Sequence, residues 1–261
     1  MRLMGYNILC GGIDRALGTS RLDEILRLVK IMQPDILALQ EANGFHRDGL
    51  MAKVSGEIQL PHTALSIGSL YQDGDRYHTA LFSRCPLLNA HMFPDGDFQS
   101  AALSVETDTP LGRVSLCNLH LHAYCEDERL RELGQILEYQ NSFDRQIIIG
   151  DFNALSRLDK DIYPDDPEFE LRFDVTDRLT GDFVDLIHQS IGESRCTYPT
   201  DIPADCDELT PARIDYVFAS SKIAQRVKSA GVIDHPIASK ASDHFPLLVE
   251  FENDMIPESP S

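Results

Sequence analysis

The sequence contains few basic residues and no long hydrophobic run. No apolar run approaches the roughly 18 residues of a transmembrane helix, and the amino-terminal stretch lacks the apolar core of a signal peptide. We therefore expect a cytoplasmic protein without a membrane partner. Its 42 acidic residues exceed its 23 basic residues, which gives a formal net charge of −19. This charge disfavours tight binding to long duplex DNA, although cations in an acidic cleft can offset the repulsion locally.

The sequence also lacks the usual cysteine motifs of zinc and redox sites. None of its six cysteines forms a Cys-x-x-Cys pair. We expect free thiols, and a Cys196–Cys206 bridge is the one pairing that stays open. The sequence His120-Leu121-His122 could chelate zinc, but no third histidine or cysteine lies at a conventional zinc spacing. His120 is therefore better suited to acid–base chemistry or to contact with a phosphate.

The length of 261 residues, with 43% hydrophobic and 25% charged residues, is typical of one folded soluble domain. We expect this domain to span residues 1–251. The segment 252–261 carries three acids and two prolines, which predicts a flexible tail. Residues 159–185 contain ten acidic and three basic residues. This composition predicts a solvated surface excursion, and its position also makes it a candidate substrate-selecting loop.

The most informative stretch begins with the apolar run 147–149 and breaks at Gly150. This pattern predicts a buried strand that ends in polar residues. Asp151 and Asn153 are two positions apart, so an extended backbone places both side chains on one side. A carboxylate beside an amide suits a hydrated cation and an oxyanion, whereas an ordinary Asp/Asn turn after a core strand is the alternative.

Other predicted strands also end in polar residues. Asn7 lies near the end of a strand over 3–9, and Glu41 follows a strand over 36–39. The apolar spacing between them predicts a helix that begins after Ser20 and stops before Pro34. Further strands are expected over residues 78–83, 100–106, 113–119, 213–218 and 247–251, and a crossover helix over 126–140.

Seven short motifs occur in order along the chain. They are Tyr-Asn at 6–7, Leu-Gln-Glu at 39–41, Ala-Leu-Phe-Ser-Arg at 80–84, Asn-Leu-His-Leu at 118–121, Gly-Asp-Phe-Asn at 150–153, Arg-Ile-Asp-Tyr at 213–216 and Ser-Asp-His at 242–244. This ordered set resembles the endonuclease/exonuclease/phosphatase superfamily, also called the deoxyribonuclease-I-like fold. The resemblance implies an α/β protein, a four-layer α/β sandwich of two packed mixed β-sheets with flanking helices.

The resemblance further implies a divalent-metal-dependent phosphoesterase that hydrolyses a phosphodiester or phosphomonoester by in-line attack of water. Glu41 would be the principal Mg²⁺ ligand, and Asn7 and Asp243 would complete the metal shell, with Mn²⁺ as a substitute. Mg²⁺ prefers hard oxygen ligands, which these three side chains provide. The remaining roles fall on residues that touch the substrate or the attacking water.

By the same resemblance, Asp151 would orient or deprotonate the attacking water, and Asn153 would hold a phosphate oxygen. His244 would be the second catalytic histidine, with Asp215 fixing its tautomer and favouring its protonated form. His120 matches the other active-site histidine, which is a phosphate contact or a leaving-group acid. A metal and cationic or amide donors would stabilise the charge that develops on the phosphate.

Four nearby residues are assigned outside this set. We expect Arg84 and Arg213 to form structural ion pairs and His122 to lie at the cleft rim. Tyr77 could line the cleft, but we expect it to pack within a strand. Leu9 stands where abasic-site endonucleases carry an acidic residue, and no basic insertion for duplex DNA is present, which favours a small or terminal phosphate ester as the substrate.

Two alternatives remain. A nuclease acting on single-stranded or terminal DNA or RNA is the nearer one, and degradation of oligonucleotides but not of small esters would support it. An inactive binding protein on this scaffold is the more distant one. The presence of Glu41, Asp151, Asp215 and His244 argues against it, because a scaffold that no longer catalyses need not keep such a set.

Overall fold

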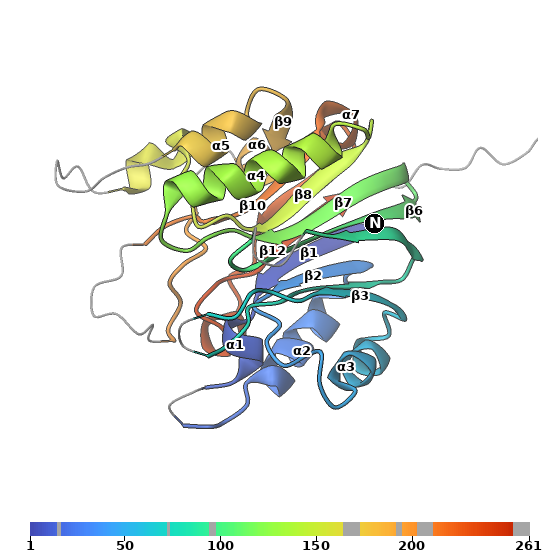
Figure 1. The fold of residues 1–261 in the computed structure, drawn as a ribbon, viewed down its shortest axis with the longest axis vertical. Helices are drawn as coiled ribbons and strands as arrows, with labels where there is room; N and C mark the ends of the chain where they lie inside the picture. Colours follow the sequence, from blue (N-terminus) through green and yellow to red (C-terminus); the bar gives the residue numbers. More distant parts are fainter. Residues whose placement is uncertain are drawn as a thin grey trace, which may run out of the picture.

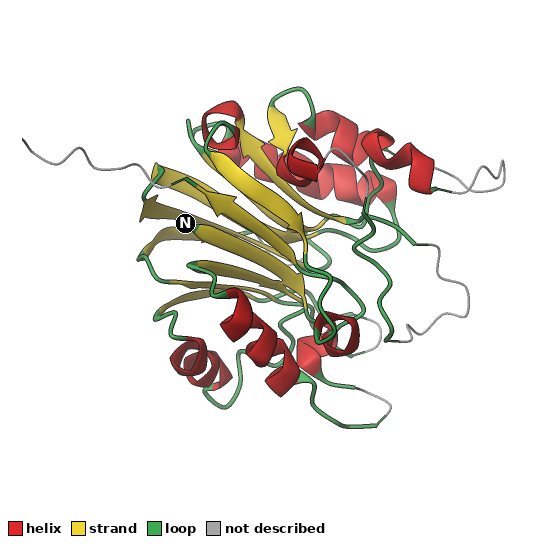
Figure 2. Cartoon of the chain, turned by 180° about the vertical axis from the view of Figure 1, so that it is seen from behind, coloured by secondary structure: helices red, strands yellow, loops and turns green. Residues whose placement is uncertain are grey.

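Two six-stranded sheets pack face to face, with helices on both outer faces (Figures 1 and 2). The computed structural model describes residues 1–14, 17–71, 74–93, 98–163, 173–191, 195–202 and 211–252. The arrangement confirms the predicted four-layer α/β sandwich of two mixed sheets. No helix in these ranges is long and apolar enough to cross a membrane.

The first sheet has the strand order β11-β12-β1-β2-β4-β3. Its β1 and β2 strands are parallel, and its other neighbouring strands are antiparallel. The parallel pair requires a crossover, which helix α2 supplies on the outer face. The strand bounds are β1 Arg2–Asn7, β2 Ile36–Gln40, β3 His62–Ser66, β4 Thr79–Ser83, β11 Val227–Val232 and β12 Leu247–Phe251.

The second sheet has the order β5-β6-β7-β8-β10-β9. Here β7 and β8 form the parallel pair, and helix α4 makes the crossover between them. Figure 1 shows α4 lying over this sheet, whereas α2 and α3 lie beneath the first sheet. The strand bounds are β5 Leu87–Met92, β6 Ala101–Thr109, β7 Gly112–His120, β8 Gln146–Asp151, β9 Phe183–Asp185 and β10 Asp215–Ser220.

The helices vary from one turn to four. The longest, α4, covers Glu126–Gln140 as predicted, and α2 covers Leu22–Met32 and ends before Pro34. The others are α1 Leu9–Gly12, α3 Leu50–Ile58, the 3₁₀ helix η1 Arg157–Ile162, α5 Asp174–Leu179, α6 Leu186–Ile191, α7 Ser221–Ala224 and α8 Ala238–Ala241.

Strand alternation divides the hydrophobic core into layers. Ile147 and Ile149 of β8 face the other sheet, whereas Ile148 faces the layer of α4 and α5. On β1, a Cβ added to Gly5 would lie only 2.8 Å from Ile149 Cδ1, so the two sheets approach closely at this point. This close approach brings the end of β1 and the end of β8 together.

Two predictions near the acidic segment were wrong. The strand predicted over 213–218 begins only at Asp215, because Arg213 is buried in ion pairs. The excursion over 159–185 is not simply solvated, because its Asp159 and Asp185 are buried as the partners of Arg213. Residues 164–172 of this excursion lie outside the described ranges.

The cysteines in the described ranges have free thiols, as predicted. The alternative Cys196–Cys206 bridge involves a residue outside those ranges, and so does the flexible tail predicted over 252–261, except for its first residue.

Candidate active site

The predicted site residues meet at one end of the two sheets. Asn7 ends β1 and Glu41 directly follows β2, while His120 ends β7 and Asp151 ends β8. Parallel strands bring their carboxyl ends to the same edge, and His120 pairs directly with Asp151 in the sheet register. Asp215 begins the antiparallel strand β10 opposite Asp151 and therefore joins the same edge.

Asp151 is buried at the centre of this cluster. Its Oδ2 accepts a hydrogen bond of 2.9 Å from Asn7 Nδ2 and lies 3.5 Å from His120 Nε2 and 3.8 Å from His244 Nε2. Its Oδ1 accepts from the backbone N–H of Asn153 at 2.9 Å. Burial raises the pKa of Asp151, and the Asp215 carboxylate adds to the rise, while His120 and His244 oppose it.

His244 and Asp215 form a buried pair. The distance between His244 Nδ1 and Asp215 Oδ2 is 2.8 Å. Burial lowers the pKa of His244, but the Asp215, Asp243 and Asp151 carboxylates outweigh burial and hold that pKa well above its usual value. The Thr197 hydroxyl oxygen accepts from the backbone N–H of Asp215 at 3.2 Å, which fixes the start of β10.

Glu41 lies beside the cluster in a left-handed backbone conformation with φ of 53°. Its two carboxylate oxygens accept from Asn7 Nδ2 at 3.3 Å and from the Cys10 backbone N–H at 2.8 Å. Asp243 is buried, and its pKa is raised by burial and further by the Glu41 carboxylate, while His244 opposes the rise. Asp243 is thus a buried carboxylate whose charged form the Glu41 carboxylate disfavours, and a divalent cation beside it would stabilise that charge.

The chemistry of the donors favours a metal ion. Asp151, Asp215 and His244 bring one ligand atom each within 4.8 Å of one another, which is a possible metal site. Within this group, however, His244 Nδ1 and Asp215 Oδ2 already bind each other. Carboxylate and amide oxygens, such as those of Glu41, Asp243 and Asn7, are harder donors than an imidazole nitrogen.

Asn153 also has a left-handed backbone, with φ of 48°, which asparagine tolerates well. Its Nδ2 donates a hydrogen bond of 3.1 Å to the carbonyl of Leu121, which fixes the direction of the side chain. The side-chain amide group has two N–H donors, and this hydrogen bond uses one of them.

His120 is buried, and its Nδ1 has no hydrogen-bond partner within the part of the chain that the structure describes. The Tyr77 ring stands edge-on to the His120 ring at 6.3 Å between centroids. Tyr77 precedes β4 and is only partly buried, so the expectation of a packed strand tyrosine was wrong.

The structural ion pairs predicted for Arg84 and Arg213 are confirmed. Arg84 pairs with Asp35 at 3.0 Å, and Arg213 pairs with Asp159 and Asp185, each at 2.6 Å. His122 accepts two backbone N–H bonds at 3.0 Å in the turn before α4.

Sequence reasoning missed two polar residues that lock the sheets together beneath the site. Gln40 of β2 donates a hydrogen bond of 2.6 Å to Asn118 of β7, and Asn118 donates to the carbonyls of Leu39 and Ala80 at 3.0 Å. It also missed Glu132 of α4, whose carboxylate accepts from the backbone N–H groups of Gln99 and His122. The first two stand inside the quoted motifs, so a polar residue within an apolar strand was the available signal.

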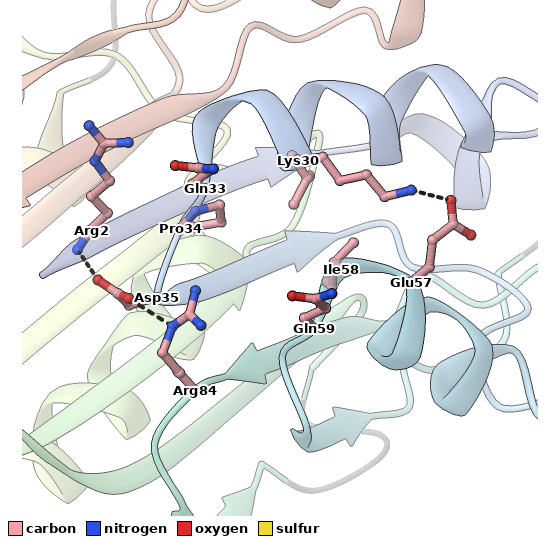
Figure 3. A pocket seen from close by; sticks show the side chains of 10 residues that line it. Arg2, Lys30, Gln33, Pro34, Asp35, Glu57, Ile58, Gln59 and Arg84 are labelled. Carbon is pink, nitrogen blue, oxygen red and sulfur yellow. Dashed lines mark hydrogen bonds and ion pairs between the residues drawn. The ribbon is translucent and has the colours of Figure 1, made fainter.

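A pocket of about 650 Å³ lies elsewhere (Figure 3). Arg2, at the beginning of β1, lines it together with Asp35 and Arg84, so it is at the opposite end of the strand from Asn7. Its charged side chains are paired, since Asp35 pairs with Arg84, Lys30 pairs with Glu57, and Arg2 pairs with Glu250 outside the pocket. This pocket is separate from the cluster around Asp151.

The sequence profile of the endonuclease/exonuclease/phosphatase family matches residues 4–244. The chain belongs to this family. A search among curated proteins found no match. Several solved structures of family members have the same fold.

Among the similar structures is the endonuclease/exonuclease/phosphatase from Beutenbergia cavernae, with 20% identity, a TM-score of 0.74, and coverage of 95% of this chain and 70% of that one. An AP endonuclease from Archaeoglobus fulgidus has 16% identity and a TM-score of 0.70, with 97% and 99% coverage. A 3′ phosphatase from Neisseria, bound to a product DNA hairpin, has 17% identity and a TM-score of 0.66, with 97% and 99% coverage. At these identities the likeness shows the fold.

Proposed function

We propose that this member of the family is a divalent-metal-dependent phosphoesterase that hydrolyses a small or terminal phosphodiester or phosphomonoester. The observation that carries the proposal is the convergence on Asp151. Nitrogen atoms of Asn7, His120 and His244 surround its Oδ2 within 2.9 to 3.8 Å, and a second carboxylate, Glu41, lies beside Asn7. Such a cluster offers a base, cationic donors and metal ligands around one phosphate.

Glu41 and Asp243 would hold Mg²⁺ or Mn²⁺, and the amide oxygen of Asn7 would complete the set. The metal would polarise the phosphate ester and neutralise its charge. The electrostatic effect of Glu41 on Asp243 supports this assignment, because Glu41 raises the pKa of Asp243 beyond the effect of burial.

Asp151 accepts a proton from the attacking water in this mechanism. Its raised pKa makes it a stronger base than an exposed carboxylate, and Asn7 and Asn153 fix the direction of its two oxygens. The water attacks phosphorus in line with the leaving group.

His244 and His120 stabilise the phosphate oxygens. Asp215 keeps His244 protonated and fixes its ring, so Nε2–H points toward the reacting centre near Asp151. His120 approaches from β7 and either contacts the phosphate or protonates the leaving group. The second amide N–H of Asn153 donates to a phosphate oxygen.

A nuclease acting on single-stranded or terminal DNA or RNA is the second candidate. The similarity to a 3′ phosphatase bound to a DNA hairpin and to an AP endonuclease favours it over unrelated phosphoesterases. The net charge of −19 disfavours long duplex DNA as the substrate.

Hydrolysis of bis(p-nitrophenyl) phosphate and p-nitrophenyl phosphate in Mg²⁺, Mn²⁺ or EDTA tests the proposal. We expect metal-dependent turnover that falls at least about 100-fold in Glu41→Ala, Asp151→Asn and His244→Ala. Glu57→Ala is the matched acidic control, because Glu57 lies in the distant pocket, and it should retain wild-type turnover.

Turnover that persists in all three site variants would contradict the proposal, because a contaminating enzyme would then explain the activity. Cleavage of single-stranded oligonucleotides without hydrolysis of either small ester would select the nuclease.

A further inference from the structure

The Asp215–His244 pair spans the two sheets. Asp215 begins β10 of the second sheet, whereas His244 lies just before β12 of the first sheet (Figure 1). The two residues are 29 positions apart, and the bond of 2.8 Å between them joins separate parts of the chain. A third part of the chain, the segment 197–200, binds the chain on both sides of this bond.

Thr197 makes contacts on both sides by itself. It is fully buried, and its hydroxyl oxygen accepts hydrogen bonds from the backbone N–H groups of Ile214 at 3.1 Å and Asp215 at 3.2 Å. Its carbonyl oxygen accepts from the backbone N–H of Phe245, the residue after His244, at 2.7 Å. One residue therefore fixes where β10 begins relative to the turn that carries the histidine.

The rest of the segment 197–200 is also held in place. The backbone N–H of Tyr198 donates to the carbonyl of Ala212 at 3.0 Å, and the backbone N–H of Ala212 donates to the carbonyl of Tyr198 at 2.8 Å. The backbone N–H of Thr200 donates to the carbonyl of Asp243 at 3.0 Å. These bonds connect the segment to the chain on each side of the pair.

Tyr198 places its ring beside the ring of His244. The two centroids are 5.0 Å apart, and the ring planes are inclined by 49°. Tyr198 is half-buried. Asp215 holds the imidazole at Nδ1 and the tyrosine ring packs against it, so Nε2 is left directed toward Asp151 at 3.8 Å.

Two contacts are needed to fix an imidazole in this position. A hydrogen bond at Nδ1 fixes one atom, and the ring can still turn about that atom. A displacement of about 1 Å at a group that acts on the reacting phosphate can lower the rate about 100-fold. The contact with Tyr198 removes this freedom, and Thr197 holds the backbone of the aspartate that makes the first contact.

We infer that Thr197 and Tyr198 are positioning residues for the Asp215–His244 pair. The inference rests on the proposed function, in which the Nε2–H of His244 stabilises the phosphate oxygens. Thr197 acts through Asp215, and Tyr198 acts through the imidazole. Since both act through the pair and not on the substrate, their loss should slow the chemical step and leave substrate binding intact.

Steady-state kinetics on the preferred ester test this inference. Thr197→Val keeps the shape of the side chain and removes the acceptor, while Thr197→Ser keeps the hydroxyl. Tyr198→Leu removes the ring, while Tyr198→Phe keeps it. We expect kcat to fall about tenfold in Thr197→Val and in Tyr198→Leu, with KM within about twofold of the wild type. Thr197→Ser and Tyr198→Phe should retain kcat.

Two distant residues supply matched controls. Thr109 Oγ1 accepts from the backbone N–H of Leu111 at 3.0 Å in the turn between β6 and β7, at the end of β7 remote from His120. The Tyr139 ring, near the C-terminal end of α4, stacks against the His91 ring at 4.3 Å between centroids. Thr109→Val and Tyr139→Leu remove the same kinds of contact and should retain kcat. An equal fall in these controls would overturn the inference, because general destabilisation would then explain the effect.

A double-variant cycle identifies the residue through which Tyr198 acts. In the His244→Ala background, Tyr198→Leu should cause no further fall in kcat, because the ring that it positions is absent. A further fall of about tenfold would overturn the inference. A raised KM with unchanged kcat in Tyr198→Leu would also overturn it, since the ring would then contact the substrate. If Thr197→Val fails to fold, Tyr198→Leu and Tyr198→Phe carry the comparison.

If no ester is hydrolysed with any metal, the proposed function fails, and proton NMR decides the inference. The His244 Nδ1–H that donates to Asp215 should give a downfield resonance that is absent from His244→Ala. We expect this resonance to be shifted or lost in Thr197→Val and Tyr198→Leu and unchanged in Thr197→Ser and Tyr139→Leu. A wild-type resonance in both Thr197→Val and Tyr198→Leu would overturn the positioning role.

Discussion

Asn7 at the end of β1 donates a hydrogen bond of 2.9 Å to Asp151 at the end of β8, and this bond joins the two sheets at the candidate active site. The same Nδ2 lies 3.3 Å from Glu41 Oε1. One amide therefore orients both the proposed base and the proposed metal ligand, although the two strands come from different sheets.

Replacing Asn7 by alanine should lower kcat/KM by about tenfold to 100-fold, because a hydrogen bond to a charged group contributes roughly 1.5–3 kcal/mol. Steady-state kinetics on the preferred ester measure this effect. Asn141→Ala at the exposed end of α4 is the matched control and should behave as the wild type. Wild-type kinetics in Asn7→Ala would show that the amide does not support catalysis.

Asp215→Asn should shift the pH dependence of activity. Burial lowers the pKa of His244, but Asp215 contributes most to holding it well above its usual value. Activity that requires protonated His244 is lost as pH rises through that pKa. Without the Asp215 carboxylate the pKa falls, so the alkaline limb of kcat/KM should move to lower pH. An alkaline limb at the wild-type position would exclude His244 as the titrating group.

Gly150→Ala should destabilise the protein by at least about 3 kcal/mol. Gly150 has φ of 148°, and a Cβ there would lie 1.9 Å from the carbonyl oxygen of Leu119 on the neighbouring strand. Gly56 in α3 has open space at its Cβ, so Gly56→Ala should stabilise by about 0.5–1 kcal/mol. Urea unfolding of the two variants measures both effects, and a tolerated Gly150→Ala would contradict the tight register of β7 and β8.

His78 should make stability depend on pH. Burial, followed by the neighbouring His46, lowers the pKa of His78 to about 4. Its Nδ1 accepts from the Gly68 N–H at 3.1 Å, and its Nε2 lies 2.8 Å from His46 Nδ1. The unfolded chain takes up the proton below about pH 6.5 while the folded chain does not, so stability falls as pH decreases from there to about 4.

The loss attributable to His78 is on the order of 3 kcal/mol at the acidic end of this window. Urea unfolding of the wild type and of His78→Gln between about pH 6.5 and 4 measures this loss, because the variant lacks the titrating ring. Parallel pH profiles for the two proteins would contradict the assignment.

The sequence predicts the strands that carry the site because their apolar runs end abruptly in polar residues. Asn7, Glu41 and Asp151 were placed at strand ends by this pattern alone, and the fold brings those ends together. The start of β10 was misplaced because Arg213, which looks like the first residue of an alternating strand, is buried between two carboxylates far away in the sequence.

Contacts between the sheets were beyond local reasoning. Gln40 and Asn118 are separated by 78 positions, and neither their periodicity nor their neighbours reveal that they meet. The same applies to Tyr77, whose partly exposed ring lies beside that of His120 although the two residues are far apart in the sequence. Local patterns identify strand ends, whereas the three-dimensional pairing of distant loops determines what surrounds them.

The most direct test is the rate of ester hydrolysis as a function of free Mn²⁺ concentration in the wild type, Glu41→Gln and Asp243→Asn. Loss of one carboxylate ligand should raise the Mn²⁺ concentration for half-maximal rate by about tenfold or more in each variant, and EDTA should abolish wild-type turnover. Turnover that continues in EDTA, or an identical Mn²⁺ requirement in all three proteins, would contradict a metal held by Glu41 and Asp243.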